Sequence, residues 1–282
     1  MNPTVSTSQS MFGPGSAERA ATGGQRDVIH VATFAGLSVA LGAAALAAGV
    51  SSSLLPFILA LGPTGIALTL AWRERGGALR GLLRLAVTRP PRRAWYLLVA
   101  LPVAWAFATV LISVALGEPT AGLFDKVVPA VFIVPLVVLL PAFAEELAWR
   151  GYAVPRLLPS MSPVTAAIVL AVPWTVLHVF LQLPGQMNAG LALSPTVVSL
   201  VAYSIILTWV VVRTGGSVLL AALIHTGFNG IVPVMGGLDV DRAWAIRAVL
   251  IAIVAAAVVA HEVGRSRREP TPPFTRRLAA DG

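Results

Sequence analysis

The sequence contains no cysteine, a single lysine and little charge of either sign. The lack of cysteine excludes disulfides, thiol catalysis, cysteine-ligated metals and lipid attachment at cysteine. Charged residues make up 11% of the 282 residues and hydrophobic residues 57%, with a mean hydropathy of +0.83. An ordinary soluble domain is excluded by this composition, which predicts a polytopic membrane protein.

The sequence also lacks the short motifs of several common enzyme and binding classes. It contains no His-Glu-x-x-His helix, no Gly-x-Ser-x-Gly turn and no phosphate loop. Its basic residues are not interleaved with the aromatic residues that nucleic-acid binding would use. We therefore expect no nucleic-acid partner, and only His, Asp, Glu, Ser and Thr remain as catalytic side chains.

Long apolar runs are abundant. A helix needs about 20 mostly apolar residues to cross a bilayer, and eight stretches meet this criterion. They are residues 28–50, 54–72, 94–116, 127–149, 163–182, 196–213, 216–236 and 242–263. We expect an all-α polytopic membrane domain with about eight transmembrane helices over residues 28–263. A disordered tail rich in Ser, Thr, Gly and Pro is predicted for residues 1–27, and a basic tail for residues 264–282.

The basic residues gather in alternate loops. If the amino terminus is inside, the cytoplasmic segments hold most of the 20 basic residues, including clusters at residues 73–93 and 265–277. Because cytoplasmic loops retain Lys and Arg, both termini are predicted to be cytoplasmic. Within the first cluster, residues 79–86 place apolar side chains on one helical face and arginines on the other. This pattern is typical of a helix in the headgroup plane, and we expect it to serve as a stop-transfer anchor.

Two adjacent glutamates and an arginine interrupt the fourth predicted span. Ionisable groups at membrane depth are costly and are usually paired, inward-facing and functional. Glu146 precedes Arg150 by four residues, the favourable spacing for an ion pair on a helix. That pairing would leave Glu145 without an ion-pair partner. Apolar surroundings raise the pKa of a carboxylate toward neutrality, which suits a general base. The alternative is that both glutamates only cap or pair at the inner interface.

Histidines interrupt two further apolar spans. His225 precedes Asn229 by four residues, so both project from one helical face, where two donors can hold a developing oxyanion. His178 shares a face with Trp174, whose indole either shapes a pocket or fills the core; we expect it to fill the core. For each histidine, the alternative is a core residue with satisfied hydrogen bonds.

Depth in the membrane decides whether these groups can meet. At 1.5 Å of rise per residue, His178 lies roughly 22 Å and His225 roughly 14 Å from the inner face. Glu145 reaches a depth of roughly 20 Å only if its helix continues to about Leu158. We therefore expect an extended helix in which Pro155 produces a kink rather than an end.

The three motifs together resemble those of the CAAX prenyl protease and bacteriocin-processing (CPBP or Abi) family of intramembrane proteases. In this sequence they read Glu145-Glu146-x-x-x-Arg150, an aromatic residue four positions before His178 (Trp174), and His225-x-x-x-Asn229. The resemblance covers about residues 125–235. Trp149 and Trp174 stand where the family usually has phenylalanine, which affects the expected shape of the pocket more than the expected chemistry.

The resemblance implies an intramembrane endopeptidase, similar to type II CAAX endopeptidases, that acts on a membrane-embedded or lipid-adjacent protein or peptide. Prokaryotic members are tied to bacteriocin immunity or maturation, so we expect a multi-pass protein of a bacterial plasma membrane. By position, Glu145 would activate water with help from His178. His225 and Asn229 would stabilise the oxyanion, supported by the pair of Glu146 and Arg150.

Metal dependence and activity itself are left open by the sequence. The family is often called a metalloendopeptidase, and two histidines with a glutamate could hold zinc. Asn229 is a poor zinc ligand and a good oxyanion donor, which favours water activation without a metal. The alternative functions are a catalytically silent membrane scaffold or bacteriocin-immunity factor that acts by binding, and a proton-coupled transporter that uses these residues as a relay.

Overall fold

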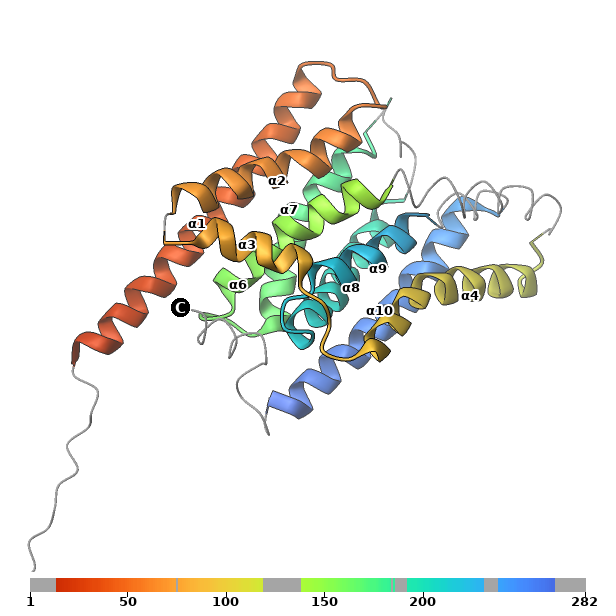
Figure 1. Ribbon diagram of the computed structural model, residues 1–282. Coiled ribbons are helices and arrows are strands. Elements are labelled where there is room, and N and C mark those ends of the chain that lie inside the picture. The colour runs from red at the N-terminus through yellow and green to blue at the C-terminus, as the bar shows by residue number, and fades with distance from the viewer. Residues whose placement is uncertain are drawn as a thin grey trace, which may run out of the picture.

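A computed structural model of the chain describes residues 14–266, except residue 75 and segments 119–137, 184, 186–191 and 231–237. Every regular element in these residues is helical, which confirms the predicted all-α class (Figure 1). The elements are α1 (Pro14–Ala47), α2 (Leu55–Arg73), α3 (Ala78–Val87), the 3₁₀ helix η1 (Arg93–Ala100), α4 (Leu101–Ala115), a helix over residues 138–146, the π-helix η2 (Leu147–Ala153), α6 (Val154–Leu157), α7 (Pro163–Phe180), α8 (Leu193–Arg213), α9 (Val218–Gly230) and α10 (Val240–Ser266).

Six helical segments of the described chain are long and apolar enough to cross a membrane, so the protein is polytopic as predicted. Their bounds lie within a few residues of six of the predicted spans. They are Gly24–Ala47, Leu55–Arg73, Arg93–Ala115, Pro163–Phe180, Leu193–Arg213 and Val240–Arg265.

The other two predicted spans lie partly outside the described residues. Of the span at 127–149, only residues 138–149 are described, and of the span at 216–236 only residues 216–230. A total of eight spans and cytoplasmic termini therefore stay predictions. Helix α1 begins at Pro14, so residues 14–27 of the predicted tail are helical, while residues 1–13 and 267–282 lie outside the described residues.

Helix α8 occupies the centre of the molecule. In Figure 1 it lies beside α9, between α1 and α2 on one side and α4 and α10 on the other. Within its most apolar window 67% of the residues are buried, against 28–33% in the other spanning segments. Ser204 on α8 donates a hydrogen bond to the carbonyl of Ala167 on α7, with an Oγ–O distance of 2.8 Å. Helix α8, the most deeply buried of the spanning segments, therefore forms the core of the bundle.

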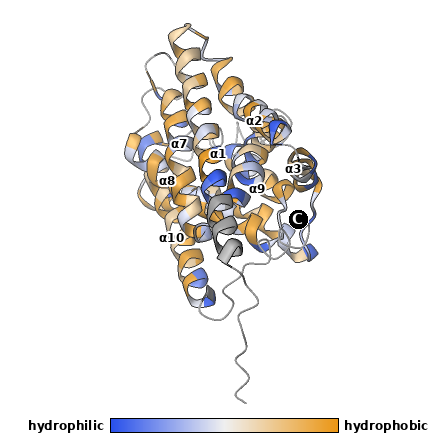
Figure 2. Cartoon of the chain, turned by 90° about the vertical axis from the view of Figure 1, so that its left-hand side faces the viewer, coloured by the Kyte–Doolittle hydropathy of each residue, from blue (hydrophilic) through white to orange (hydrophobic). Residues whose placement is uncertain are grey.

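The outer helices expose large apolar side chains. Phe107, Val172 and Ile253 are 60–64% exposed, and hydrophobic colour covers much of the outside of the bundle in Figure 2. Such a surface is unfavourable in water and suits the acyl chains of a bilayer.

The helix that carries the glutamate motif continues well beyond residue 149, as predicted. Residues 138–146 run without a break into η2 and then α6. At the end of the π-helix the amide of Val154 bonds to the carbonyl of Trp149, five residues earlier. Pro155 lies directly after the π-helix, in the first turn of α6, and does not end the helix. Single π-turns inside α-helices are frequent at functional sites.

Charged groups near the helix ends tie the bundle together. Glu74, at the end of α2, accepts a hydrogen bond from the Tyr152 hydroxyl at 2.6 Å and pairs with Arg156 and His30. Arg213 on α8 pairs with Glu262 on α10. These contacts connect α1, α2 and α6 at one place and α8 with α10 at another.

Helix α3 differs from the predicted anchor in what its apolar face contacts. Leu82 and Leu85 are buried, and Leu82 packs against η2 at Gly151. The apolar face of α3 is thus largely covered by protein, while Leu83 on its outer side stays 49% exposed.

Candidate functional site

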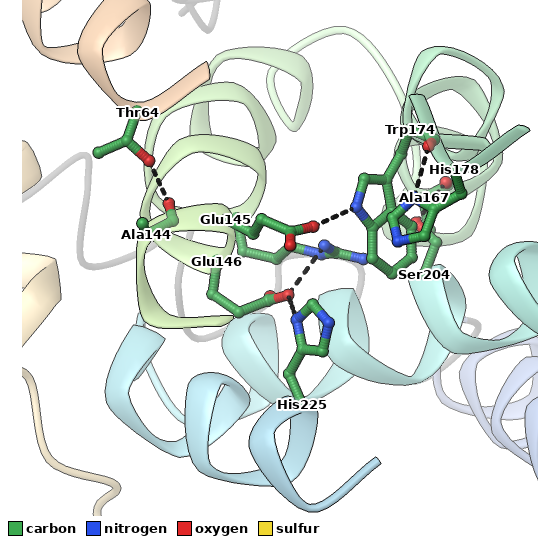
Figure 3. Close-up of polar contacts among 10 residues, drawn as sticks. Thr64, Ala144, Glu145, Glu146, Ala167, Trp174, His178, Ser204 and His225 are labelled. Atoms are coloured by element: carbon green, nitrogen blue, oxygen red, sulfur yellow. Dashed lines mark hydrogen bonds and ion pairs between the residues drawn. The ribbon is translucent and has the colours of Figure 1, made fainter. Parts of the chain in front are cut away.

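The candidate site lies where the extended helix over residues 138–157 meets α7, α8 and α9. Figure 3 shows Glu145 pointing toward Trp174 of α7 and Glu146 pointing toward His225 of α9. Three helices far apart in the sequence thus contribute to one polar cluster inside an apolar bundle.

Glu146 is a shared acceptor at the centre of this cluster. Its side chain is fully buried, and its Oε1 atom accepts from Arg150 Nη1 at 3.0 Å and from His225 Nδ1 at 2.8 Å. The predicted ion pair with Arg150 is therefore present, while the contact with His225 was not foreseen. A carboxylate that binds two cationic or donor groups at once is poorly placed to act as a base.

Arg150 is buried as deeply as its partner, at 1% exposure. Its guanidinium carbon lies 4.4 Å from the centre of the Trp174 ring, a cation–π contact. Burying a cation at this depth costs several kcal/mol unless it is paired. Glu146 and the Trp174 ring together provide that compensation.

Glu145 has a different environment from its neighbour. It is 9% exposed, and its Oε2 atom accepts a hydrogen bond from Trp174 Nε1 at 2.8 Å. Its Oε1 atom makes no hydrogen bond to any described residue. One oxygen of Glu145 is therefore held in place while the other is left for a ligand or water.

Trp174 does more than the predicted filling of the core. It is 1% exposed and packs tightly, but its indole N–H also orients Glu145, so the expectation of a packing role alone was wrong. A signal was present in the sequence, because tryptophan stands where the resembling family usually has phenylalanine. Only the indole can donate a hydrogen bond.

Thr64 on α2 also reaches the site and was missed. Its hydroxyl donates to the carbonyl of Ala144, directly before Glu145, with an Oγ1–O distance of 2.5 Å (Figure 3). Thr64 lies 80 positions from Ala144 in a span without motifs, so no local pattern in the sequence indicated the contact.

His178 is half-buried near the end of α7. Its Nδ1 atom lies 2.9 Å from the carbonyl oxygen of Trp174. Because a carbonyl only accepts, Nδ1 carries a proton, and in the neutral ring Nε2 keeps a lone pair that can accept a hydrogen bond. The imidazole packs edge-on to the Trp174 ring, with 5.0 Å between ring centres.

His225 is held from several sides. It is 1% exposed, and its ring packs edge-on against Trp174 at 5.8 Å and against Tyr203 at 5.7 Å between ring centres. With Nδ1 bound to Glu146, the ring nitrogen left for a ligand is Nε2. Trp174 contacts both histidines, so the structure brings Glu145, His178 and His225 around one indole.

Asn229 lies one turn after His225 on α9 and is half-buried. Its side chain makes no hydrogen bond to a described residue. Between them on α9, Gly227 allows close packing, because a Cβ there would lie 3.1 Å from Pro102 Cγ. The amide of Asn229 therefore stays available as a donor near His225.

The residues around the cluster do not form a metal centre. Among the described parts of the chain, no group of three or more His, Cys, Asp or Glu side chains is placed to hold a metal ion. The described side chains are therefore not placed to hold a zinc ion, and no step below depends on one.

Comparison with known proteins agrees with the resemblance drawn from the motifs. Residues 127–231 match the family model described as type II CAAX prenyl endopeptidase Rce1-like. No curated protein matches the chain. The matched segment contains the whole polar cluster, and the match supports a CAAX-type intramembrane protease in general.

Proposed function

We propose that this membrane protein, with its Rce1-like segment at residues 127–231, is an endopeptidase that hydrolyses a peptide bond with a water molecule activated by Glu145. The substrate is a membrane-associated protein or peptide. The protein is a multi-pass component of a bacterial plasma membrane.

The observation that carries the proposal is the unequal environment of two adjacent glutamates. Glu146 is fully buried and its Oε1 atom is shared by Arg150 and His225, whereas Glu145 is 9% exposed and its Oε1 atom has no hydrogen-bond partner among the described residues. Glu145 is therefore the carboxylate that a water molecule can reach. Such a division of roles within a carboxylate pair is typical of acid–base catalysis.

In the proposed reaction, Glu145 Oε1 removes a proton from water as the water oxygen bonds to the scissile carbonyl carbon. The water is also held by His178, because Nε2 of the neutral ring accepts its second hydrogen. Trp174 keeps Glu145 in one orientation through the other carboxylate oxygen.

The negative charge that develops on the attacked carbonyl oxygen is stabilised by the Asn229 amide and by an N–H donor at His225 Nε2. Glu146 holds the His225 ring in place, because its carboxylate accepts from Nδ1. Glu145 then gives its proton to the leaving amine as the C–N bond breaks. The products are a carboxylate and an amine, and no acyl-enzyme is formed.

A lipid-adjacent substrate is supported by the apolar surroundings of the site. An open pocket of about 300 Å³ is lined by Leu139, Leu140, Phe143 and Leu219. Leu139, Leu140 and Phe143 lie on the helix that carries both glutamates, and Leu219 lies at the start of α9, the helix that carries His225. An extended apolar segment of a membrane protein would fit such a surface better than a polar peptide from solution.

The experiment that tests the proposal is quantitative mapping of peptide termini in membranes from cells that carry wild type or Glu145→Gln at equal expression. General bases contribute typically 10²–10⁴-fold, so termini that depend on the wild type should fall at least about 100-fold. They would identify candidate substrates directly.

Glu118→Gln is the matched control. Glu118 pairs with Arg242, whose side chain is 47% exposed, and neither residue belongs to the polar cluster, so the substitution should leave the termini unchanged. If wild type and Glu145→Gln give the same termini, and the variant still supports any phenotype of the chain, the proposal fails. A non-catalytic scaffold or immunity factor that acts by binding would then be favoured.

A further inference from the structure

Six exposed arginines between the end of α2 and the start of η1 have no acidic partner among the described residues. Glu74, the acidic residue in this stretch, does not pair with them, because it is bound to Tyr152 and Arg156. We call the six the arginine surface: Arg73, Arg80, Arg84, Arg89, Arg92 and Arg93.

Exposed apolar and aromatic side chains lie among these arginines and close to the first and last of them in the sequence. Trp72 is 68% exposed, Leu83 49%, Val87 72% and Tyr96 37%. On α3, Leu83 and Val87 share the outer face with the arginines, because the inner face is buried against the protein. Arginine mixed with exposed Trp, Tyr, Leu and Val is typical of a segment at the boundary between acyl chains and headgroups.

The same segment packs directly on both elements that position the candidate site. Leu82 of α3 lies so close to Gly151 of η2 that a Cβ there would be 3.0 Å from Leu82 Cδ1 and 3.4 Å from Val218 Cγ2 of α9. At the end of α3, the Ser217 hydroxyl donates to the carbonyl of Thr88 at 2.7 Å. Helix α3 therefore contacts the junction between η2, which carries Arg150, and α9, which carries His225.

We propose that the arginine surface binds the phosphate groups of anionic membrane lipids, and that this binding stabilises the junction of α3, η2 and α9. The exposed Leu83 and Val87 favour a lipid over an acidic protein segment as the partner, because they would enter the acyl region while the arginines reach the phosphates. Lipid binding by the arginine surface does not require the proposed proteolysis.

The test uses the purified full-length chain in neutral phosphatidylcholine bicelles, with phosphatidylglycerol added in increasing amounts. Wild type should bind phosphatidylglycerol and show a rise in Tm, because a ligand of the folded state stabilises it. In Arg80→Gln/Arg84→Gln, the affinity for phosphatidylglycerol should fall roughly 20- to 30-fold, since each arginine near an anionic surface contributes about fivefold. Raising the salt concentration should weaken binding to wild type.

Two further double variants separate the effect of charge from damage to α3. Arg80→Lys/Arg84→Lys preserves the charge and should retain most of the binding, and Arg89→Gln/Arg92→Gln should weaken it without altering α3. All three variants should match the Tm of wild type in phosphatidylcholine alone, because these side chains are exposed and have no acidic partner in the described part of the chain. Equal affinity for phosphatidylglycerol in wild type and both glutamine variants, or equal losses in the lysine and glutamine variants of Arg80 and Arg84, would overturn the proposal.

Discussion

At the scale of single residues, the two adjacent glutamates have different tasks because their neighbours differ. Glu146 balances the charge of the buried Arg150 and binds the buried His225. Glu145 accepts a hydrogen bond from the indole N–H of Trp174. The sequence predicted the pair of Glu146 and Arg150, because spacing along one helix is a local property. The contacts with His225 and Trp174 join separate helices, and local spacing does not specify them.

We expect Glu146→Gln to lower the yield of folded protein and its Tm, whereas Glu145→Gln should leave both near wild type. Removing one partner of a buried ion pair typically costs about 3–5 kcal/mol, because Arg150 would remain buried and unpaired. The measurement is the amount and Tm of detergent-solubilised protein. Adding Arg150→Met to Glu146→Gln should recover part of the loss, and equal stability of the two single glutamine variants would contradict this account.

Trp174→Phe should lower kcat roughly tenfold with little change in KM, and it should lower Tm by a few degrees. The phenyl ring fills most of the same space, but the hydrogen bond to a charged carboxylate, worth about 1.5–3 kcal/mol, is lost. Kinetics on a peptide that contains a mapped cleavage site would measure the effect. Trp149→Phe is the matched control, because Trp149 Nε1 has no hydrogen-bond partner among the described residues; a similar kcat for both variants would argue against a positioning role for Trp174.

At the scale of elements, the extended helix over residues 138–157 gives the site its geometry. Its continuation past residue 149 was predicted, because the three polar groups could meet only if Glu145 lay deep in the membrane. The π-turn of η2 was not predicted, because one additional residue in a helical turn leaves no clear mark in an apolar sequence. The apolar face of α3 was assigned to lipid, yet periodicity alone does not distinguish a lipid-facing surface from one that packs on protein.

Thr64→Val should destabilise the protein by about 0.6 kcal/mol, and up to about 1.7 kcal/mol, because it removes the hydrogen bond from α2 to the carbonyl before Glu145. Thermal unfolding in bicelles would measure the change. Thr69→Val serves as the control, since the exposed Thr69 donates only to Gly65 within its own helix. If both substitutions have the same effect, the contact between α2 and the site has no special role.

At the scale of the whole molecule, hydropathy predicted the spanning segments well, because bilayer thickness limits the length of an apolar helix. The arrangement of the helices around α8 depends on side-chain complementarity, which composition does not specify. Orientation in the membrane stays a prediction based on the arginine clusters.

The absence of native cysteine allows a direct test of orientation. Ser53→Cys, between α1 and α2, should react with a membrane-impermeant maleimide in intact cells. Gly264→Cys, where a side chain has open space, should react only after the cells are permeabilised. The reverse pattern would show that the termini face outward.

The central claim is hydrolysis by water that Glu145 activates. Its most direct test is the reaction of the purified full-length chain in liposomes with a peptide that contains a cleavage site mapped in membranes. The account predicts that wild type cleaves the peptide at that site, and that equal amounts of folded Glu145→Gln cleave it at least about 100-fold more slowly. Cleavage by Glu145→Gln at the rate of wild type would contradict it.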